Sequence, residues 1–350
     1  MENAMHTHVV IMAGGIGSRL WPASTPDMPK QFMDLLGVGK TMIQLTFERF
    51  SSICPARNVW VVTSERYADI VRSQLPMVPG EQVLTEPEPR NTAPCIAYAC
   101  WKISACDREA NIVVTPADAL VLDTVRFTSV ISTALSRTRD SGSIVTVGIA
   151  PSRPETGYGY ICAEEKGLDK IVKVSQFKEK PNLTTAQEYL KAGNYFWNAG
   201  IFVWNAATIM SEMRAHSPQI AGIMDRIAAS FGTASEADVL KELFPQCEKI
   251  SIDYAVMEKS ANIYVIASDI GWSDLGSWSS IKQHIPSDEN GNVKVGGDVR
   301  LFNTSGTIVH AAKEKTVIVD GLENYIVAES NGRLLVCPLS DEQLIKQFSE

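Results

Sequence analysis

The sequence lacks the cysteine patterns of a disulfide framework or a zinc site. Its seven cysteines are odd in number and include no C-x-x-C pair, so they favour a reducing compartment. No apolar run approaches the roughly 20 residues that span a bilayer, and the first eight residues lack the basic and apolar regions of a signal peptide. These absences predict a soluble protein of the cytoplasm.

Positive charge is also scarce. The 32 Lys and Arg residues stand against 40 Asp and Glu residues, which gives a formal net charge of −8. This balance argues against a broad surface for nucleic acid or anionic membranes, so basic groups that bind anions must act locally. With 350 residues, 45% of them hydrophobic, the chain can hold one large domain and a smaller one.

Short β-branched runs alternate with helical stretches through most of the chain. The runs typical of buried strands begin at residues 9–12, 59–63, 112–115 and 144–148. Segments between them, such as 42–50 and 93–105, carry apolar residues at helical spacing. This alternation predicts an α/β domain with a largely parallel sheet, and later strand-like runs extend it over residues 1–285.

The character of the sequence changes after residue 285. Turn formers fill residues 286–292, and the helical pattern then nearly vanishes. Apolar triplets follow at nine-residue intervals, with Ser-Gly, Asp-Gly and Asn-Gly turns between them, beginning near Thr307, Thr316, Tyr325 and Leu334. We expect a small β-rich domain over residues 286–350, either a meander or a β-helical solenoid.

A glycine-rich loop follows the first predicted strand. Glycines there let backbone N–H groups surround a phosphate. The dinucleotide fingerprint fails because Leu20 stands where Gly or Ala is required. The segment Gly39-Lys40-Thr41 ends like a P-loop, but the first glycine of that motif would fall on Asp34, so a turn before a helix is favoured.

The pattern G-G-x-G-x-R-L-x-P over residues 14–22, followed by Pro29-Lys30, resembles the signature of the sugar-nucleotide pyrophosphorylase family. The resemblance implies a Rossmann-like nucleotidyltransferase domain with a mixed, mostly parallel sheet. It also implies that Arg19 and Lys30 are catalytic and supply positive charge around the nucleotide phosphates. The residues that wrap the nucleoside triphosphate would be Ala13, Gly14, Gly15, Gly17 and Ser18.

Four further motifs resemble the mannose-1-phosphate guanylyltransferase branch of that family. They are P-K-Q-F at 29–32, E-P-x-x-R-N-T-A-P at 86–94, W-N-A-G-I-F at 197–202 and S-I-D-Y-A-V-M-E-K at 251–259. The branch implies transfer of GMP from GTP to mannose 1-phosphate, with GDP-mannose and pyrophosphate as products. Asn91 and Thr92 would either bind the nucleotide or cap the next helix. Ser251 or Asp253 is expected to cap a short helix.

The same resemblance implies a metal site and a sugar-phosphate site. Asp118 at the end of a strand and Asp274 in W-x-D-x-G-x-W would bind Mg²⁺. Family members more often have His after the first aspartate, whereas Ala119 stands here, and the alternative is that Asp118 caps a helix. The sugar phosphate would be bound by Gly159, Glu179, Lys180 and Asn198.

Three rival functions stay open at this point. The chain could use another sugar 1-phosphate or nucleotide, act as a P-loop kinase, or bind sugar nucleotides as a non-catalytic regulator. The expected partners are GTP and mannose 1-phosphate, without nucleic acid or membrane, and a homodimer is an open alternative. Because the sequence stops at Glu350, we expect no mannose 6-phosphate isomerase activity. Replacing Asp118 or Asp274 by Asn should barely lower stability, or even raise it, because removing one of two close carboxylates relieves repulsion in the metal-free protein.

Overall fold

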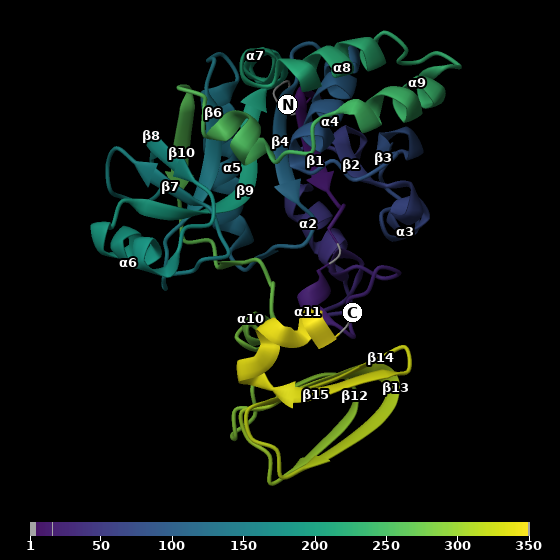
Figure 1. Ribbon diagram of the computed structural model, residues 1–350, viewed down its shortest axis with the longest axis vertical. Helices are drawn as coiled ribbons and strands as arrows, with labels where there is room; N and C mark the ends of the chain where they lie inside the picture. The colour runs from purple at the N-terminus through teal and green to yellow at the C-terminus, as the bar shows by residue number, and fades with distance from the viewer. Residues whose placement is uncertain (1–4, 16, 349–350) are drawn as a thin grey trace. The chain divides into compact units, whose positions relative to one another are not determined.

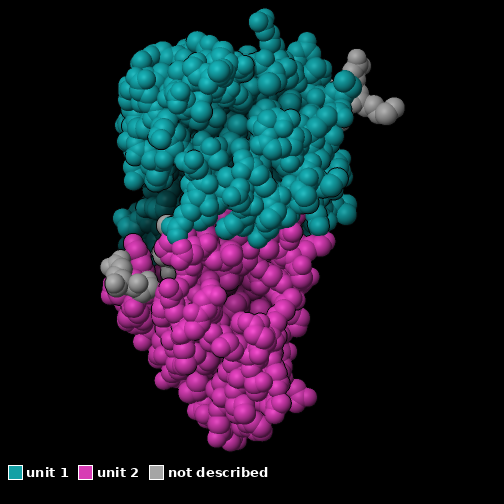
Figure 2. Space-filling model, turned by 90° about the vertical axis from the view of Figure 1, so that its right-hand side faces the viewer, with its two compact units in different colours: residues 1–14, 47–116, 121–272 teal, residues 15–46, 117–120, 273–350 magenta. Residues whose placement is uncertain are grey.

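The computed structural model describes residues 5–15 and 17–348. Packing divides the chain into two compact units (Figure 2). Unit 1 contains residues 1–14, 47–116 and 121–272, and unit 2 contains residues 15–46, 117–120 and 273–350. Most of the glycine-rich loop therefore packs with the C-terminal sheet. The predicted domain boundary between residues 285 and 286 is not tested by this grouping and stays a prediction.

Unit 1 is built on a nine-stranded mixed sheet with the order β3-β2-β1-β4-β9-β6-β10-β8-β7 (Figure 1). Its strands are β1 (Thr7–Met12), β2 (Val59–Ser64), β3 (Val83–Glu86), β4 (Asn111–Pro116), β6 (Ile144–Ile149), β7 (Tyr160–Ala163), β8 (Ile171–Lys178), β9 (Tyr195–Asn205) and β10 (Ile263–Ala267). The four β-branched runs expected as strands are β1, β2, β4 and β6. Each is almost wholly buried, as apolar strands covered on both faces should be.

The sheet is parallel in one half and mixed in the other. Strands β1 to β4 pair in parallel, as do β6 and β10. The eleven-residue strand β9 runs antiparallel to β4, β6 and β7, and β8 runs antiparallel to its neighbours β10 and β7. The predicted α/β class and mixed sheet are confirmed, and the predominance of parallel pairing holds for the first four strands.

Helices connect these strands and cover them. They are α2 (Met42–Phe50), α3 (Ala68–Gln74), α4 (Thr92–Cys106), α5 (Thr124–Thr138), α6 (Leu183–Ala192), α7 (Ala206–His216), α8 (Pro218–Ala228) and α9 (Glu236–Leu243). The predicted helices at 42–50 and 93–105 are α2 and α4. Among the described residues, no helix combines the length and apolar character needed to cross a bilayer.

Unit 2 combines residues 15–46 and 117–120 with the C-terminal sheet. That sheet has the order β12 (Val293–Phe302), β13 (Ile308–Asp320), β14 (Tyr325–Ser330) and β15 (Arg333–Pro338), and the short helices α10 (Trp278–Lys282) and α11 (Ile345–Phe348) flank it in sequence. One hydrophobic core joins Leu20, Leu35 and Met42 to Ile308 and Ile326. Burying side chains of this size stabilises the unit by roughly 1.5–3 kcal/mol each.

The nine-residue spacing reflects how the C-terminal strands stack. Strands β12, β13 and β14 pair in parallel, with Asp298 beside Thr316 and Ile308 beside Ile326, so segments two nine-residue steps apart lie side by side. This is the pairing of a solenoid, and only β15 returns antiparallel. The triplets near Thr307 and Thr316 both belong to the single long strand β13 and not to two strands. The three expected turns each contain a glycine with positive φ, at Gly306, Gly321 and Gly332.

The short strands β5 (Leu120–Val121) and β11 (Trp272–Ser273) pair with each other. In both, the chain passes from one unit to the other.

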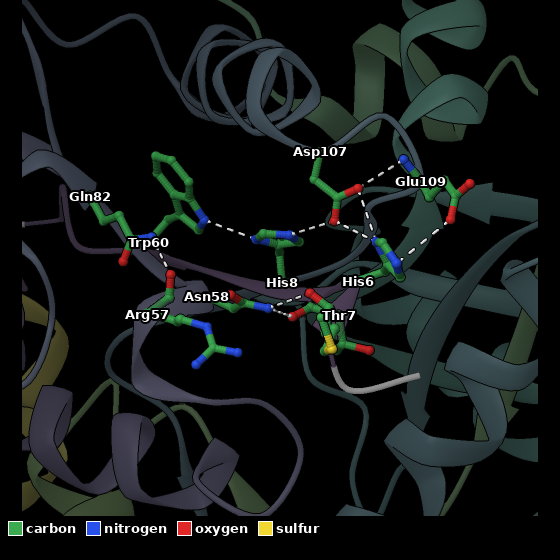
Figure 3. A network of polar contacts seen from close by, with 10 residues as sticks. His6, Thr7, His8, Arg57, Asn58, Trp60, Gln82, Asp107 and Glu109 are labelled. Carbon is green, nitrogen blue, oxygen red and sulfur yellow. Dashed lines mark hydrogen bonds and ion pairs between the residues drawn. The ribbon is translucent and has the colours of Figure 1, made fainter. Parts of the chain in front are cut away.

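A polar network surrounds the start of β1 in unit 1 (Figure 3). The Trp60 indole N–H donates to His8 Nδ1 at 3.1 Å, so the neutral imidazole carries its proton on Nε2 and donates to Asp107 at 3.1 Å. Asp107 also accepts from the backbone N–H of Glu109 and contacts His6 at 3.0 Å. Burial lowers the pKa of His8, although Asp107 partly opposes this, and the neutral form is the one that the network requires.

We expect Asp107→Ala to lower the free energy of unfolding by about 1–3 kcal/mol, because it leaves a buried imidazole N–H without an acceptor. Urea unfolding at pH 7.5 measures the change. Glu109→Ala is the matched control, since its carboxylate is 80% exposed and lies 3.6 Å from His6. Equal losses in the two variants would contradict this account of the network.

Candidate active site

The glycine-rich loop begins directly after β1. In unit 1, Ala13 N–H donates to the Val62 carbonyl at 2.8 Å, which continues the strand pairing for one residue. In unit 2, the Gln31 side chain donates to the Gly15 carbonyl at 2.8 Å, and Gln31 is almost fully buried. The glutamine of the P-K-Q-F motif therefore supports the loop backbone. Ser18 begins the 3₁₀ turn η1 (Ser18–Leu20), and its side chain lies outside the described part of the chain.

Five of the predicted site residues meet in one pocket of unit 2. Lys30, in the turn η2 (Lys30–Phe32), places Nζ 2.9 Å from Asp118 Oδ2 and donates to the Asp274 carbonyl at 2.6 Å. Arg19 lines the same pocket, which has a volume of about 280 Å³ and a wall completed by Gly17, Leu20 and Gly276. Residues from three distant parts of the sequence thus surround one small, charged cavity.

Gly17 is required by both its backbone and its surroundings. Its φ of +71° lies in the left-handed region that disfavours side chains. A Cβ there would lie 3.0–3.2 Å from the aliphatic stem of Lys30. The glycine thus lets the lysine stem pack against the loop while the ammonium group stays in the pocket.

The aspartates of the pocket differ in their contacts. Asp118 does not cap α5, which begins after Asp123, whose carboxylate accepts from Arg126 N–H at 2.8 Å. Asp274 Oδ1 accepts from Gly276 N–H at 3.1 Å. The capping alternative for Asp118 is therefore wrong, and its carboxylate faces Lys30.

The pocket carboxylates suit a metal ion whose remaining ligands are water and substrate phosphates. No group of three His, Cys, Asp or Glu side chains able to hold a metal occurs in residues 5–15 and 17–348. Mg²⁺, however, is commonly bound by one or two carboxylates together with substrate phosphates and water. The donor set of Asp118 and Asp274 fits that pattern and does not fit an all-protein cage.

The P-loop alternative fails on hydrogen bonding. The Asp34 carboxylate accepts from Val38 N–H at 2.9 Å and from Gly39 N–H at 2.7 Å. The backbone groups that would bind phosphate already bind a carboxylate, and Gly37 and Gly39 take the positive φ values of a turn. The predicted turn is confirmed, and the kinase alternative has no support.

The R-N-T-A-P motif of unit 1 begins α4. Asn91 has a φ of +66° and its side-chain oxygen accepts from Thr92 N–H, so it caps the helix. The Thr92 hydroxyl accepts from Ile252 N–H at 2.9 Å, and Ala93 N–H donates to the Ile250 carbonyl at 3.1 Å. Two motifs separated by 160 positions in the sequence are therefore hydrogen-bonded to each other. The capping expected of Asn91 is observed, and its nucleotide role stays a prediction.

Sequence reasoning missed the environment of Glu86, which it noted only as part of a motif. Glu86 ends the parallel strand β3 and is 8% exposed. Burial raises its pKa to about 8, and its Oε1 has no hydrogen-bond partner among the described residues. Its Oε2 lies 3.9 Å from where a Cβ of Gly14 would be. An acidic residue at the carboxyl end of a buried parallel strand was the available signal.

The predicted sugar-binding residues also meet, within unit 1. Asn198 N–H donates to the Gly159 carbonyl at 2.9 Å, and a Cβ on Gly159 would lie 2.5 Å from Glu179 Oε2. Lys180, which is exposed, forms an ion pair with Glu179. The structure adds Asp253, whose Oδ1 accepts from the Asn198 amide at 3.1 Å. Neither Ser251 nor Asp253 is the N-cap, because the turn begins after Ile252, which has no side-chain cap. The Ser251 hydroxyl lies 3.4 Å from Tyr254 N–H, and the Asp253 side chain accepts from Asn198.

The predicted site residues therefore form two sets, one in each unit. Unit 1 holds Ala13, Gly14, Asn91, Thr92, Gly159, Glu179, Lys180 and Asn198, and unit 2 holds Gly15, Gly17, Ser18, Arg19, Lys30, Asp118 and Asp274.

Comparison with known proteins gives the family. The model of the nucleotidyl transferase family matches residues 8–291. The chain belongs to this family. It is 36% identical over 350 residues to mannose-1-phosphate guanylyltransferase of Escherichia coli K12, covering 97% of this chain and 72% of that protein. The enzyme of the same name from Klebsiella pneumoniae is 35% identical over 347 residues, covering 97% and 73%.

A solved structure supports the fold of this nucleotidyltransferase. The protein from Thermus thermophilus described as mannose-1-phosphate geranyltransferase superposes with a TM-score of 0.88 at 31% identity, covering 99% of this chain and 98% of that one. The family resemblance and the fold class expected from the motifs are confirmed.

The ion pair of Lys30 changes the effect on stability that we expect from losing the Asp118 carboxylate. Asp118→Asn should lower the free energy of unfolding by about 1–3 kcal/mol, because a lysine that is 9% exposed loses its charged partner. The melting temperature should fall accordingly. Asp274→Asn should cost less, since an amide oxygen can still accept from Gly276 and the backbone carbonyl that accepts from Lys30 is kept. Thermal melts of both variants with EDTA present measure the difference, and equal melting temperatures would refute it.

Proposed function

We propose that the chain transfers GMP from GTP to mannose 1-phosphate and releases GDP-mannose and pyrophosphate. The observation that carries the proposal is the similarity, over 97% of the chain, to enzymes named mannose-1-phosphate guanylyltransferase. The grouping of Arg19, Lys30, Asp118 and Asp274 in one pocket supports it, because a reaction between two polyanions requires this density of positive charge and metal-binding oxygen.

The reaction needs no side-chain nucleophile. A sugar phosphate carries close to two negative charges near neutral pH, since its second pKa is about 6, so it supplies the attacking oxygen. That oxygen forms a bond to the α-phosphorus of GTP as the bond to the bridging oxygen breaks, and pyrophosphate leaves with the electron pair. Arg19 and Lys30 would stabilise the charge on the leaving group, and the protein would otherwise act by positioning.

Asp118 and Asp274 are the residues that would hold Mg²⁺. When bound, the metal ion would neutralise part of the negative charge on the phosphates. Asp118 Oδ2 and the Asp274 carbonyl both bind Lys30 Nζ, so these two residues also keep the lysine ammonium group in the pocket.

Glu86 offers the acceptor pattern that guanine requires. The base presents two adjacent N–H donors, which one carboxylate can accept together, whereas adenine presents a donor beside an acceptor. Glu86 is buried with an oxygen that lacks a described partner, near Gly14 in unit 1. Binding of two donors would lower its raised pKa again.

Gly159, Glu179, Lys180 and Asn198 would bind the sugar phosphate. Glu179 can accept from sugar hydroxyls, and Lys180 can neutralise the phosphate. A non-catalytic regulator is not favoured, because it would have no need of the charged pocket. The homodimer, the cytoplasmic location and the absence of nucleic-acid and membrane partners remain predictions.

Product analysis with a panel of nucleoside triphosphates and sugar 1-phosphates tests the proposed function. The wild-type chain should prefer GTP to ATP and UTP, and mannose 1-phosphate to its competitors. Glu86→Gln should reduce the ratio of kcat/KM for GTP over ATP by about 10- to 100-fold, because one bidentate base contact is lost. Glu81→Gln, at an exposed position, is the control. Equal wild-type rates with GTP and ATP would refute the nucleotide assignment.

Removal of charge from the pocket should stop turnover while the fold survives. We expect Arg19→Ala and Lys30→Met each to reduce kcat by about 10²- to 10³-fold, and the methionine keeps the stem that packs on Gly17. Lys40→Ala, in the segment that resembles a P-loop, should keep normal turnover. Steady-state kinetics with circular dichroism checks this, and near-normal rates in the first two variants would overturn their assignment.

A further inference from the structure

The amide of Asn198 is held in one orientation by three neighbours. Its Oδ1 accepts from Gly200 N–H at 3.0 Å and lies 3.4 Å from the Thr146 hydroxyl, and its Nδ2 donates to Asp253 at 3.1 Å. Gly200 has a φ of +70°, a conformation that suits glycine and points its N–H at the amide oxygen. Asn198 therefore turns its acceptor inward, and what it can offer a ligand is the second N–H of Nδ2.

This orientation constrains what a bound hydroxyl group must do. A hydroxyl that accepts from Asn198 Nδ2 still has its own proton to donate, and a buried donor without an acceptor is costly. The acceptors available beside Asn198 are the carboxylates of Asp253 and Glu179. Glu179 binds Lys180 and lies against Gly159. The Asp253 carboxylate interacts with Ser251, and its Oδ1 accepts from the same Asn198 amide group that would donate to the hydroxyl oxygen.

Asp253 sits in an unusual backbone segment. It is the first residue of a π-helical turn (Asp253–Met257), closed by Glu258 N–H donating to the Asp253 carbonyl at 2.9 Å. Such turns are rare and occur frequently at functional sites. The segment is fixed from the other side by Thr92 and Ala93, which bind Ile252 and Ile250. Burial and then the charge of Glu179 raise the pKa of Asp253 to about 6. Glu179 and Asn198 both lie beside Gly159, since a Cβ there would be 2.5 Å from Glu179 Oε2 and 3.4 Å from Asn198 Cβ.

We propose that Asp253 determines sugar specificity: its carboxylate accepts the proton of the same ring hydroxyl whose oxygen accepts from Asn198, and it holds Asn198 in the donor orientation. The proposal rests on the proposed function, since it concerns the sugar 1-phosphate site of that reaction. Glu179, Asn198 and Asp253 then recognise the sugar by hydrogen bonds to its hydroxyl groups. For one of these hydroxyls, Asp253 is the acceptor and Asn198 is the donor.

Substitution of Asp253 by Asn tests the pair with little change in shape. We expect Asp253→Asn to raise KM for mannose 1-phosphate on the order of 10- to 100-fold, because a charge-assisted hydrogen bond is lost, while KM for GTP changes less than about twofold. Glu258→Gln, an exposed residue at the end of the same turn, is the matched control and should leave both KM values unchanged. If the Asn variant does not fold, Asp253→Ala takes its place.

A substrate series separates hydroxyl recognition from a structural role. Sugar 1-phosphates that lack the 2-, 3- or 4-hydroxyl are compared with the parent in wild type and variant. One analogue should lose at least about tenfold in kcat/KM with the wild type and almost nothing further with Asp253→Asn, because the variant has already lost that contact.

The outcomes are distinct for the two proposals. If every analogue loses the same factor in both proteins, or if KM for GTP rises together with KM for the sugar phosphate, Asp253 does not read a hydroxyl and the inference is wrong. If the wild type does not use mannose 1-phosphate, the proposed function fails, and the same series built on the sugar 1-phosphate that it does use still decides the role of Asp253.

Discussion

The ion pair between Lys30 and Asp118 is the interaction on which the charged pocket depends. A lysine this buried needs a partner, because an uncompensated ammonium group away from water is strongly unfavourable. Asp118 provides the charge and the Asp274 carbonyl accepts a second hydrogen bond. Since these three residues come from three separate stretches of unit 2, the pair that satisfies one buried charge also draws the candidate metal ligands together.

The candidate sugar site of unit 1 is built from neutral and acidic side chains. The carboxylates of Glu179 and Asp253 and the amide of Asn198 occupy one region, and their hydrogen bonds leave a donor and acceptors for a polar ligand. Hydrogen bonds from Ile252 to Thr92 and from Ala93 to Ile250 join the R-N-T-A-P and S-I-D-Y-A segments, so each motif stabilises the other. A change at Thr92 would therefore act on the segment that carries Asp253 as well as on the start of α4.

Several expectations from the sequence were met because local signals were sufficient. The predicted β-branched runs are strands β1, β2, β4 and β6. The turn before α2 is held by the Asp34 carboxylate, which accepts from Val38 and Gly39 N–H. Others failed because the deciding partner was remote. Nothing near Asp118 in the sequence indicates that it binds Lys30, and nothing near Asp253 indicates that it faces Asn198. The triplets at Thr307 and Thr316 merged into β13 because strand pairing, and not apolar content, determines where a strand ends.

The amino-acid sequence by itself determined the α/β class, the family and the identity of the candidate residues, because motif spacing and apolar periodicity are local properties of the chain. Tertiary structure alone decided their relationships: which carboxylate neutralises Lys30, which way the Asn198 amide points, and that Glu86 is buried with an oxygen lacking a described partner. The physical reason is that desolvation and hydrogen-bond pairing depend on distances across the fold, and residues far apart in the sequence supply them.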